Sequence, residues 1–208
     1  MLDEPRSVDV ANRCIESGKK FGIHIEKFKA ITPKDNPIKL LNDMGIDDRP
    51  FENEWCRKEN AIGCFLSHIL LHNEIDEDEI MVLEHDAIFK KPLVKWPFKD
   101  LVNIGKPSYS SYNKKEDRVK AHGIYPLYSK DKLLGTHAYI IKKHFAPKII
   151  ELAKIKPAPL DVFLNKNDFP SIQEYHPWPV EVDDNFTSIQ KEAGCRAKHN
   201  WKKGITII

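Results

Sequence analysis

A long helical pattern that leads straight into a short apolar run constrains the fold more than any other feature of the sequence. Residues 60–75 repeat apolar side chains every three to four positions, which predicts a helix. After an acidic turn at residues 76–79, residues 80–83 form a wholly apolar run, typical of a strand buried in a parallel sheet. A helix followed by a buried strand is the pattern of an α/β protein.

The rest of the chain continues this alternation of helices and strands. Helices are expected at residues 5–18, 38–44, 142–155 and 160–164, and strands at residues 21–28, 135–141 and 180–182. A polar stretch rich in Lys, Ser and Tyr at about residues 105–132 predicts a mobile loop, and the C-terminal tail is basic. The 208 residues suit a single domain, residues 1–208, with helices flanking a central sheet.

Charge and cysteine content exclude several classes of protein. The net charge of +2 produces no field that would mark the whole chain as a nucleic-acid or membrane binder. No apolar run approaches the ~18 residues of a membrane span, and the first residues are too acidic and polar for a signal peptide, so we expect a cytoplasmic protein without a membrane span. The scattered Cys14, Cys56, Cys64 and Cys195 indicate reduced thiols rather than a disulfide framework or a zinc cage.

Two carboxylates follow the apolar run directly, in the segment Glu84-His85-Asp86. Open α/β sheets build ligand sites just beyond the carboxyl ends of their strands. Residues two apart at a strand end can point to one side, and carboxylate oxygens bind the divalent cations that neutralise a leaving diphosphate. Taken alone, the three residues are equally compatible with an ordinary solvated loop.

Five short blocks give this segment its context. In chain order they are Gly63–His68, Met81–Ala87, Gly135–Tyr139, Pro159–Asp161 and Thr187–Ile189. Together they resemble the pattern of glycosyltransferase family 25, found in lipooligosaccharide and collagen galactosyltransferases, over roughly residues 55–190. The resemblance implies a GT-A fold with a mixed, mainly parallel sheet. It also implies an inverting transfer of a hexose from a nucleotide-sugar, a UDP-sugar, to a glycan hydroxyl, with Mn²⁺ or Mg²⁺ as cofactor.

Position by position, the resemblance assigns the metal site to the same segment. Glu84 and Asp86 match the outer members of the family's Glu-Asp-Asp triplet, and His85, a donor-site residue, replaces the middle acid. This replacement removes a negative charge, although a histidine nitrogen can still bind manganese. Residues 1–6 match the place just after the family's first strand, so that strand is expected to be missing.

The remaining site residues come from the other blocks. Ser67 and His68 match a pair that lines the donor site, although His68 and His72, four residues apart, also fit a core face of a helix. Asp161 matches the Pro-x-Asp position and is our candidate for the base that takes the acceptor proton, with the N-cap of a short helix as the alternative. Gly135 and Thr136 would let the backbone approach the substrates, or simply form a tight turn before a strand.

Three other functions stay open at this stage. Tyr and Lys residues interleave at 108–120, and the tail is basic and aromatic, so hydroxymethylated bases in DNA are a second class of acceptor. A catalytically inactive GT-A-like binding module is another alternative. A nucleotidyltransferase would also place acidic pairs after a buried strand, but the acidic start of the chain lacks the Gly-rich basic loop of that class.

Overall fold

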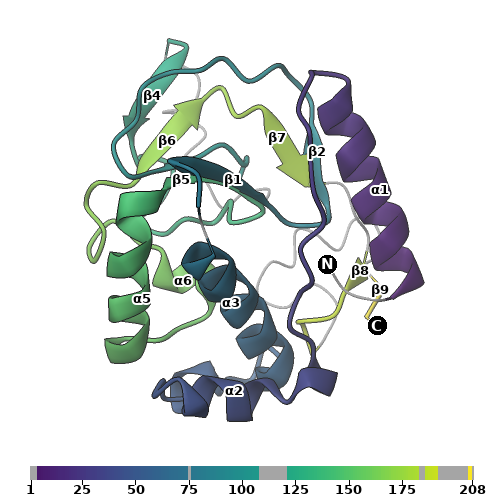
Figure 1. Ribbon diagram of the computed structural model, residues 1–208, viewed down its shortest axis with the longest axis vertical. Helices are drawn as coiled ribbons and strands as arrows, with labels where there is room; N and C mark the ends of the chain where they lie inside the picture. The colour runs from purple at the N-terminus through teal and green to yellow at the C-terminus, as the bar shows by residue number, and fades with distance from the viewer. Residues whose placement is uncertain (1–3, 75, 108–120, 183–185, 192–205, 208) are drawn as a thin grey trace.

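The computed structural model describes residues 4–74, 76–107, 121–182, 186–191 and 206–207 (Figure 1). Its helices are α1 (Pro5–Lys19), α2 (Pro37–Asp43), α3 (Lys58–Asn73), α5 (Ala146–Ile155) and α6 (Leu160–Phe163), with 3₁₀ turns at Pro33–Asp35, Arg49–Phe51 and Lys143–Phe145. All the predicted helices are confirmed. Glu4 caps α1 by accepting a hydrogen bond from the Ser7 N–H, and Pro147 lies in the first turn of α5, where its missing N–H costs nothing.

Five strands form the main sheet, in the order β1-β5-β3-β6-β4. They are β1 (Glu79–Leu83), β3 (Leu101–Asn103), β4 (Gly123–Pro126), β5 (Ala138–Lys142) and β6 (Gln173–His176). The mixed α/β class is confirmed, but among these strands only β3 and β6 pair in parallel. The sheet is therefore less parallel than we expected, because β5 enters between β1 and β3 and runs against both.

Shorter pairs of strands complete the structure. β2 (Ala87–Phe89) pairs in antiparallel fashion with β7 (Val180–Val182), which confirms the predicted strand at 180–182. β8 (Phe186–Thr187) and β9 (Thr206–Ile207) pair in parallel. β4 lies at the C-terminal part of the predicted loop, whose centre at 108–120 lies outside the described residues. Residues 192–205 of the basic tail also lie outside them.

β1 lies at the edge of the sheet rather than at its centre. Its register places Val82 opposite Tyr139, and the Glu84 N–H donates to the His137 carbonyl at 2.8 Å. Because alternate residues of an antiparallel strand face opposite edges, the N–H and C=O groups of Met81 and Leu83 point away from β5. No described strand pairs with that edge.

The predicted strand at 21–28 is wrong. The chain from α1 descends past β2 to α2 in an extended form, but within the described residues it joins no sheet (Figure 1). Its alternating pattern arises because one side faces the protein and the other faces solvent. We call residues 23–31 the crossing segment.

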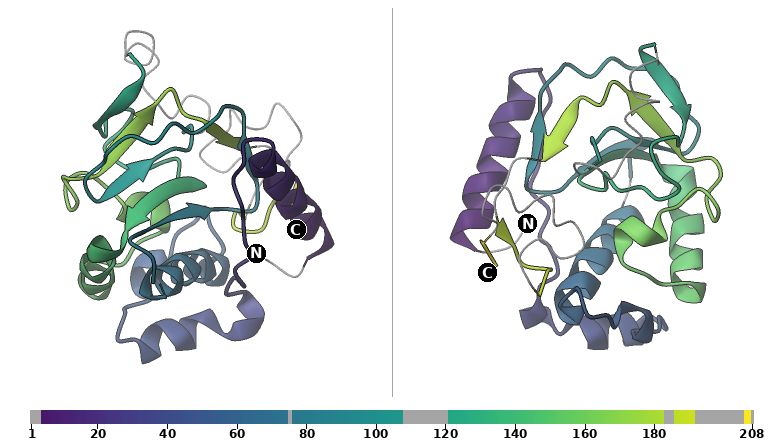
Figure 2. Two further views of the ribbon diagram at one scale, coloured as in Figure 1. Left: turned by 45° about the horizontal axis from the view of Figure 1, so that its top comes forward. Right: turned by 180° about the vertical axis from the view of Figure 1, so that it is seen from behind.

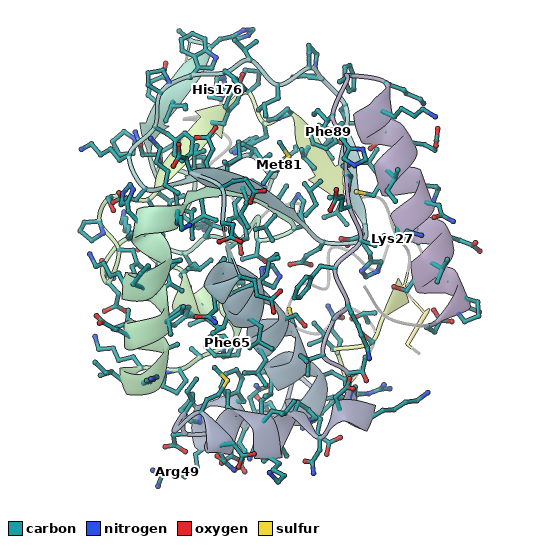
Figure 3. The ribbon with its side chains drawn as sticks, in the orientation of Figure 1. Lys27, Arg49, Phe65, Met81, Phe89 and His176 are labelled. Atoms are coloured by element: carbon teal, nitrogen blue, oxygen red, sulfur yellow. The ribbon has the colours of Figure 1, made fainter. Side chains whose placement is uncertain are left out.

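The core lies between the sheet and the helices α3 and α5, which pack side by side against one of its faces (Figure 2). Edge-to-face aromatic contacts run through this layer from Phe51 to Phe65, Phe163, Phe169 and Phe145, with ring centroids 5.2–5.6 Å apart. Phe65 marks the middle of α3 in Figure 3. No helix in the described part of the chain has the length and apolarity needed to cross a membrane.

Candidate functional site

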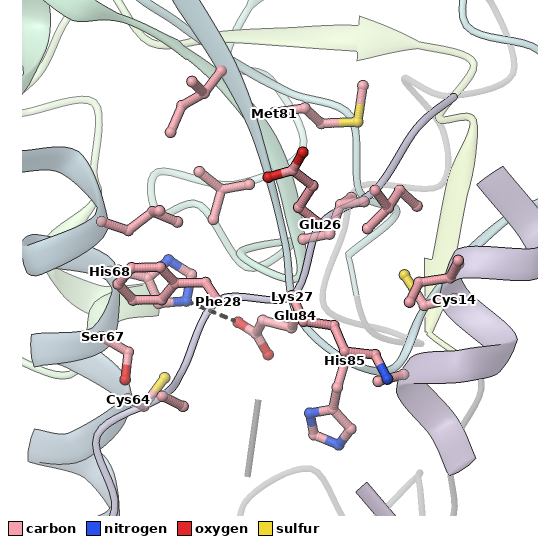
Figure 4. A pocket seen from close by; sticks show the side chains of 18 of the residues that line it. Cys14, Glu26, Lys27, Phe28, Cys64, Ser67, His68, Met81, Glu84 and His85 are labelled. Carbon is pink, nitrogen blue, oxygen red and sulfur yellow. Dashed lines mark ion pairs between the residues drawn. The ribbon is translucent and has the colours of Figure 1, made fainter. Parts of the chain in front are cut away.

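A cavity of about 610 Å³ opens between the free edge of β1, the helix α3 and the crossing segment (Figure 4). Met81 and Leu83 of β1 line it, followed by Glu84 and His85. Cys14 of α1 closes one side. The cavity is thus bounded on one wall by backbone groups that no described strand satisfies, and on the other by side chains of α3.

Two pairs of residues on the helix α3, each four positions apart, contact different parts of the structure. The pairs are Gly63 with Ser67, and Cys64 with His68. The close approach of the crossing segment requires glycine at position 63, because an added Cβ would lie 2.7 Å from the carbonyl oxygen of Ile31. One turn later, Ser67 Oγ accepts a hydrogen bond from the Ile31 N–H at 2.8 Å. These two residues therefore hold the crossing segment, while Cys64 and His68, on the adjacent stripe, face the cavity.

His68 connects the cavity to a buried polar group. Its Nδ1 lies 2.7 Å from the hydroxyl of Tyr139, and Nε2 of His72 lies 2.7 Å from the same hydroxyl. On the cavity side, His68 Nε2 lies 3.8 Å from Glu84 Oε1, the contact drawn in Figure 4. Burial lowers the pKa of His68 to about 4 and that of His72 to about 3, so both rings are neutral near pH 7.

Glu84 and His85, the first two residues after β1, point in different directions (Figure 4). The Glu84 side chain is 30% exposed and turns toward His68, whereas the His85 ring points away from it (Figure 4). Burial lowers the pKa of His85, although the charge of Asp86 acts in the opposite sense. Asp86 is not among the described residues that line the cavity, and its Oδ1 is buried with no hydrogen-bond partner among the described residues.

The Cys64 thiol lies in the electrostatic field of carboxylates from distant parts of the chain. Burial is the main cause that raises the pKa of its thiol well above the usual value. The negative charges of Glu84, Asp161 and Asp86 add to the effect, in that order. All three carboxylates predicted from the sequence therefore act on one thiol beside the cavity.

Residues 11–101 match the model of glycosyltransferase family 25 (LPS biosynthesis protein). The match confirms the family resemblance inferred from the sequence. It runs from α1 to the first residue of β3 and includes Ser67, His68 and the segment Glu84-His85-Asp86. A search of curated proteins gave no match.

Asp161 lies beyond the region matched by family 25, in the first turn of α6. Pro159, not Asp161, occupies the N-cap position of this helix. Desolvation by the surrounding protein raises the pKa of Asp161 and the charge of Lys132 lowers it, while the residue keeps access to solvent. Its role as a base in a family 25 reaction stays a prediction.

Gly135 and Thr136 also lie beyond the matched region, in the turn that precedes β5. An added Cβ on Gly135 would lie 2.3 Å from the carbonyl oxygen of Gly105, so the two backbones pack directly together. Glycine is thus required here for packing within the protein. Contacts of Gly135 and Thr136 with a substrate stay a prediction.

Sequence reasoning missed two features of the site. It treated Cys64 as one of several scattered thiols, and it included Tyr139 only as the last residue of a motif block. The spacing of Cys64 and His68, four residues apart on a predicted helix, was the available signal for the first. Nothing local indicates that Tyr139 bridges two histidines, because that contact joins residues about 70 positions apart along the chain.

Proposed function

We propose that this protein is a glycosyltransferase that moves a hexose from a nucleotide-sugar, preferably a UDP-sugar, to a hydroxyl of a glycan acceptor with inversion. The observation that carries the proposal is Glu84, which stands at the end of β1 in the wall of the cavity and inside the region matched by family 25. Ligand pockets commonly have volumes of about 300–1,000 Å³, and this cavity of about 610 Å³ falls in that range.

The carboxylates of Glu84 and Asp86 would hold Mn²⁺ or Mg²⁺. The buried Oδ1 of Asp86, which has no hydrogen-bond partner among the described residues, fits this role because a buried carboxylate oxygen is costly unless a cation or a donor compensates it. When bound, the cation would neutralise the charge that develops on the leaving diphosphate. His68 and Ser67 would line the donor side, where neutral His68 can approach a polar group of the donor without adding charge.

Asp161 would act as the base. As the acceptor oxygen attacks the anomeric carbon, the bond from that carbon to the diphosphate breaks and the hydroxyl proton passes to the Asp161 carboxylate. A raised pKa makes a carboxylate a better proton acceptor near neutral pH. The access of Asp161 to solvent leaves room for an acceptor hydroxyl to approach it.

A panel of UDP- and GDP-sugars with Mn²⁺ tests the proposal through released nucleotide and thermal shift. We expect turnover with at least one donor, and Asp86→Ala should reduce it at least about 100-fold because it removes a cation ligand. Asp43→Ala, at an exposed ion pair with Lys39 on α2, is the matched control and should keep full activity. Asp161→Asn should lower kcat more than it raises KM, because a base acts in the transition state.

Each result has a clear reading. A thermal shift without turnover would favour the inactive binding module, and neither signal with any donor would refute the transferase. The segments behind the DNA hypothesis, residues 108–120 and most of the tail, lie outside the described residues. A DNA acceptor therefore stays a prediction from the sequence.

A further inference from the structure

Three potential metal ligands of different chemistry meet at the cavity wall. In the described part of the chain, the ligand atoms of Cys64, His68 and Glu84 all lie within 4.8 Å of one another. We propose that they form a binding site for a borderline divalent cation, with Zn²⁺ as the preferred ion. This site differs from the carboxylate pair Glu84 and Asp86, and its occupation does not depend on sugar transfer.

The geometry is close to that of a bound site. Zinc–nitrogen and zinc–oxygen bonds of about 2.0 Å and zinc–sulfur bonds of about 2.3 Å place tetrahedral ligand atoms about 3.3–3.5 Å apart. The distance from His68 Nε2 to Glu84 Oε1 is 3.8 Å. Small rotations of side chains close the remaining gaps, and two of the ligands are already fixed on one stripe of α3.

The buried hydroxyl of Tyr139 prepares His68 to act as a ligand. Metal-bound histidines usually donate their second ring N–H to a neighbouring acceptor, which fixes the orientation and tautomer of the ring. His68 Nδ1 lies 2.7 Å from the Tyr139 oxygen, and this contact leaves Nε2 directed at Glu84. With Nδ1–H donating to Tyr139, the Tyr139 hydroxyl can in turn donate to Nε2 of His72.

The charges around Cys64 favour a cation. The negative field of Glu84, Asp161 and Asp86, which opposes loss of the thiol proton, is the field that attracts Zn²⁺. On binding, the S–H bond breaks, a sulfur–zinc bond forms and the proton passes to solvent, so the net charge at the site rises by one unit.

The donor set also discriminates between metals. A thiolate and an imidazole suit Zn²⁺, whereas Mn²⁺ and Mg²⁺ prefer oxygen ligands. Three protein ligands would leave the fourth tetrahedral position open toward the cavity, as in zinc sites that bind a water or a substrate. Since Glu84 belongs to both donor sets, zinc here would compete with the cation proposed for sugar transfer.

Titration of the chelator-treated protein with ZnCl₂ or CoCl₂ alone tests the site. We expect one ion per chain and, with Co²⁺, an absorption band from thiolate-to-metal charge transfer. Cys64→Ser should abolish that band and weaken zinc binding at least about 100-fold, and Tyr139→Phe should weaken it about 10-fold as the loss of an outer-shell partner. Cys14→Ser, at another thiol in the same cavity, is the matched control and should change neither signal.

The outcomes separate the site from the proposed function. Absence of the band, or equal zinc affinities for Cys64→Ser and folded wild type, would overturn the zinc site and leave the transferase proposal standing. A thermal melt establishes that each variant is folded, and His68→Gln, which should weaken zinc binding to a similar extent, gives a second test. Asp86→Ala should retain the cobalt band even where transfer is lost, and zinc should inhibit transfer by wild type but not by Cys64→Ser.

Discussion

Glu174 lies on β6 of the main sheet and Glu84 directly follows its edge strand β1, and their carboxylates have different surroundings. Glu174, on β6, is fully buried, and its carboxylate accepts five hydrogen bonds of 2.7–3.2 Å. The donors are Asn103 Nδ2, the Tyr128 N–H, the N–H and hydroxyl of Ser129, and Trp178 Nε1. The negative charge of Glu174 is thus satisfied entirely by the protein.

Glu84 follows an edge strand and lies in the wall of a cavity. Its near neighbour His68 stands 3.8 Å away, beyond hydrogen-bonding distance, and the Oδ1 of Asp86 has no hydrogen-bond partner among the described residues. A carboxylate that is fully buried among donors belongs to the structure, whereas one that is partly exposed in the wall of a cavity is accessible to a ligand. The comparison therefore separates a structural acid from candidate functional ones.

The largest expected effect is on the structural side. Glu174→Gln places an amide NH₂ among N–H and O–H donors and removes the charge that they compensate, so we expect a loss of about 3–5 kcal/mol in the free energy of unfolding. Urea denaturation measures it. Glu181→Gln is the control. Glu181 lies on β7 and forms a half-exposed ion pair with Lys106, so this change should lower the free energy of unfolding by less than about 1 kcal/mol. Similar losses in both variants would remove the distinction drawn above.

The second largest expected effect is a loss of stability in acid, which acts through His68 and His72. His68 and His72 are neutral in the folded protein because burial lowers their pKa values to about 4 and about 3, from 6.5. Between pH 6.5 and pH 4 the unfolded chain binds protons that the folded chain does not, so stability falls as the pH falls. Each ring should account for a loss on the order of 3 kcal/mol over this range.

His72→Gln checks this pH dependence. The variant keeps a polar group beside Tyr139 but cannot titrate, so its unfolding free energy should change less between pH 6.5 and pH 4 than that of wild type. An unchanged slope in His72→Gln would contradict the neutral, buried state of the ring.

The helices and the strand β1 could be predicted from the sequence, because local patterns of residues determine them. Local patterns predicted the five helices that the structure describes, and the apolar run before Glu84 predicted β1. The position of β1 at the edge of the described sheet, and the finding that the crossing segment pairs with no described strand, could not be predicted, because strand pairing depends on contacts between residues far apart in the chain. For the same reason, the contacts of the Tyr139 hydroxyl with His68 and His72 could not be predicted.

The smallest expected effect on stability is at Glu84. Its side chain is partly exposed in the wall of the cavity, so Glu84→Gln should change the free energy of unfolding by less than about 1 kcal/mol. The same variant should lose nucleotide-sugar turnover and cobalt binding. Thermal melts beside both assays test the contrast with Glu174→Gln, and a loss of stability as large as in that variant would show that Glu84 is structural too.

The open edge of β1 has a consequence beyond ligand binding. Met81 and Leu83 turn backbone donors and acceptors toward the cavity, and an unpaired strand edge is a template on which a strand from another molecule can add. A strand that entered this opening would meet the same backbone groups that a bound ligand meets. A ligand bound in the cavity would therefore cover this edge and leave no room for an added strand.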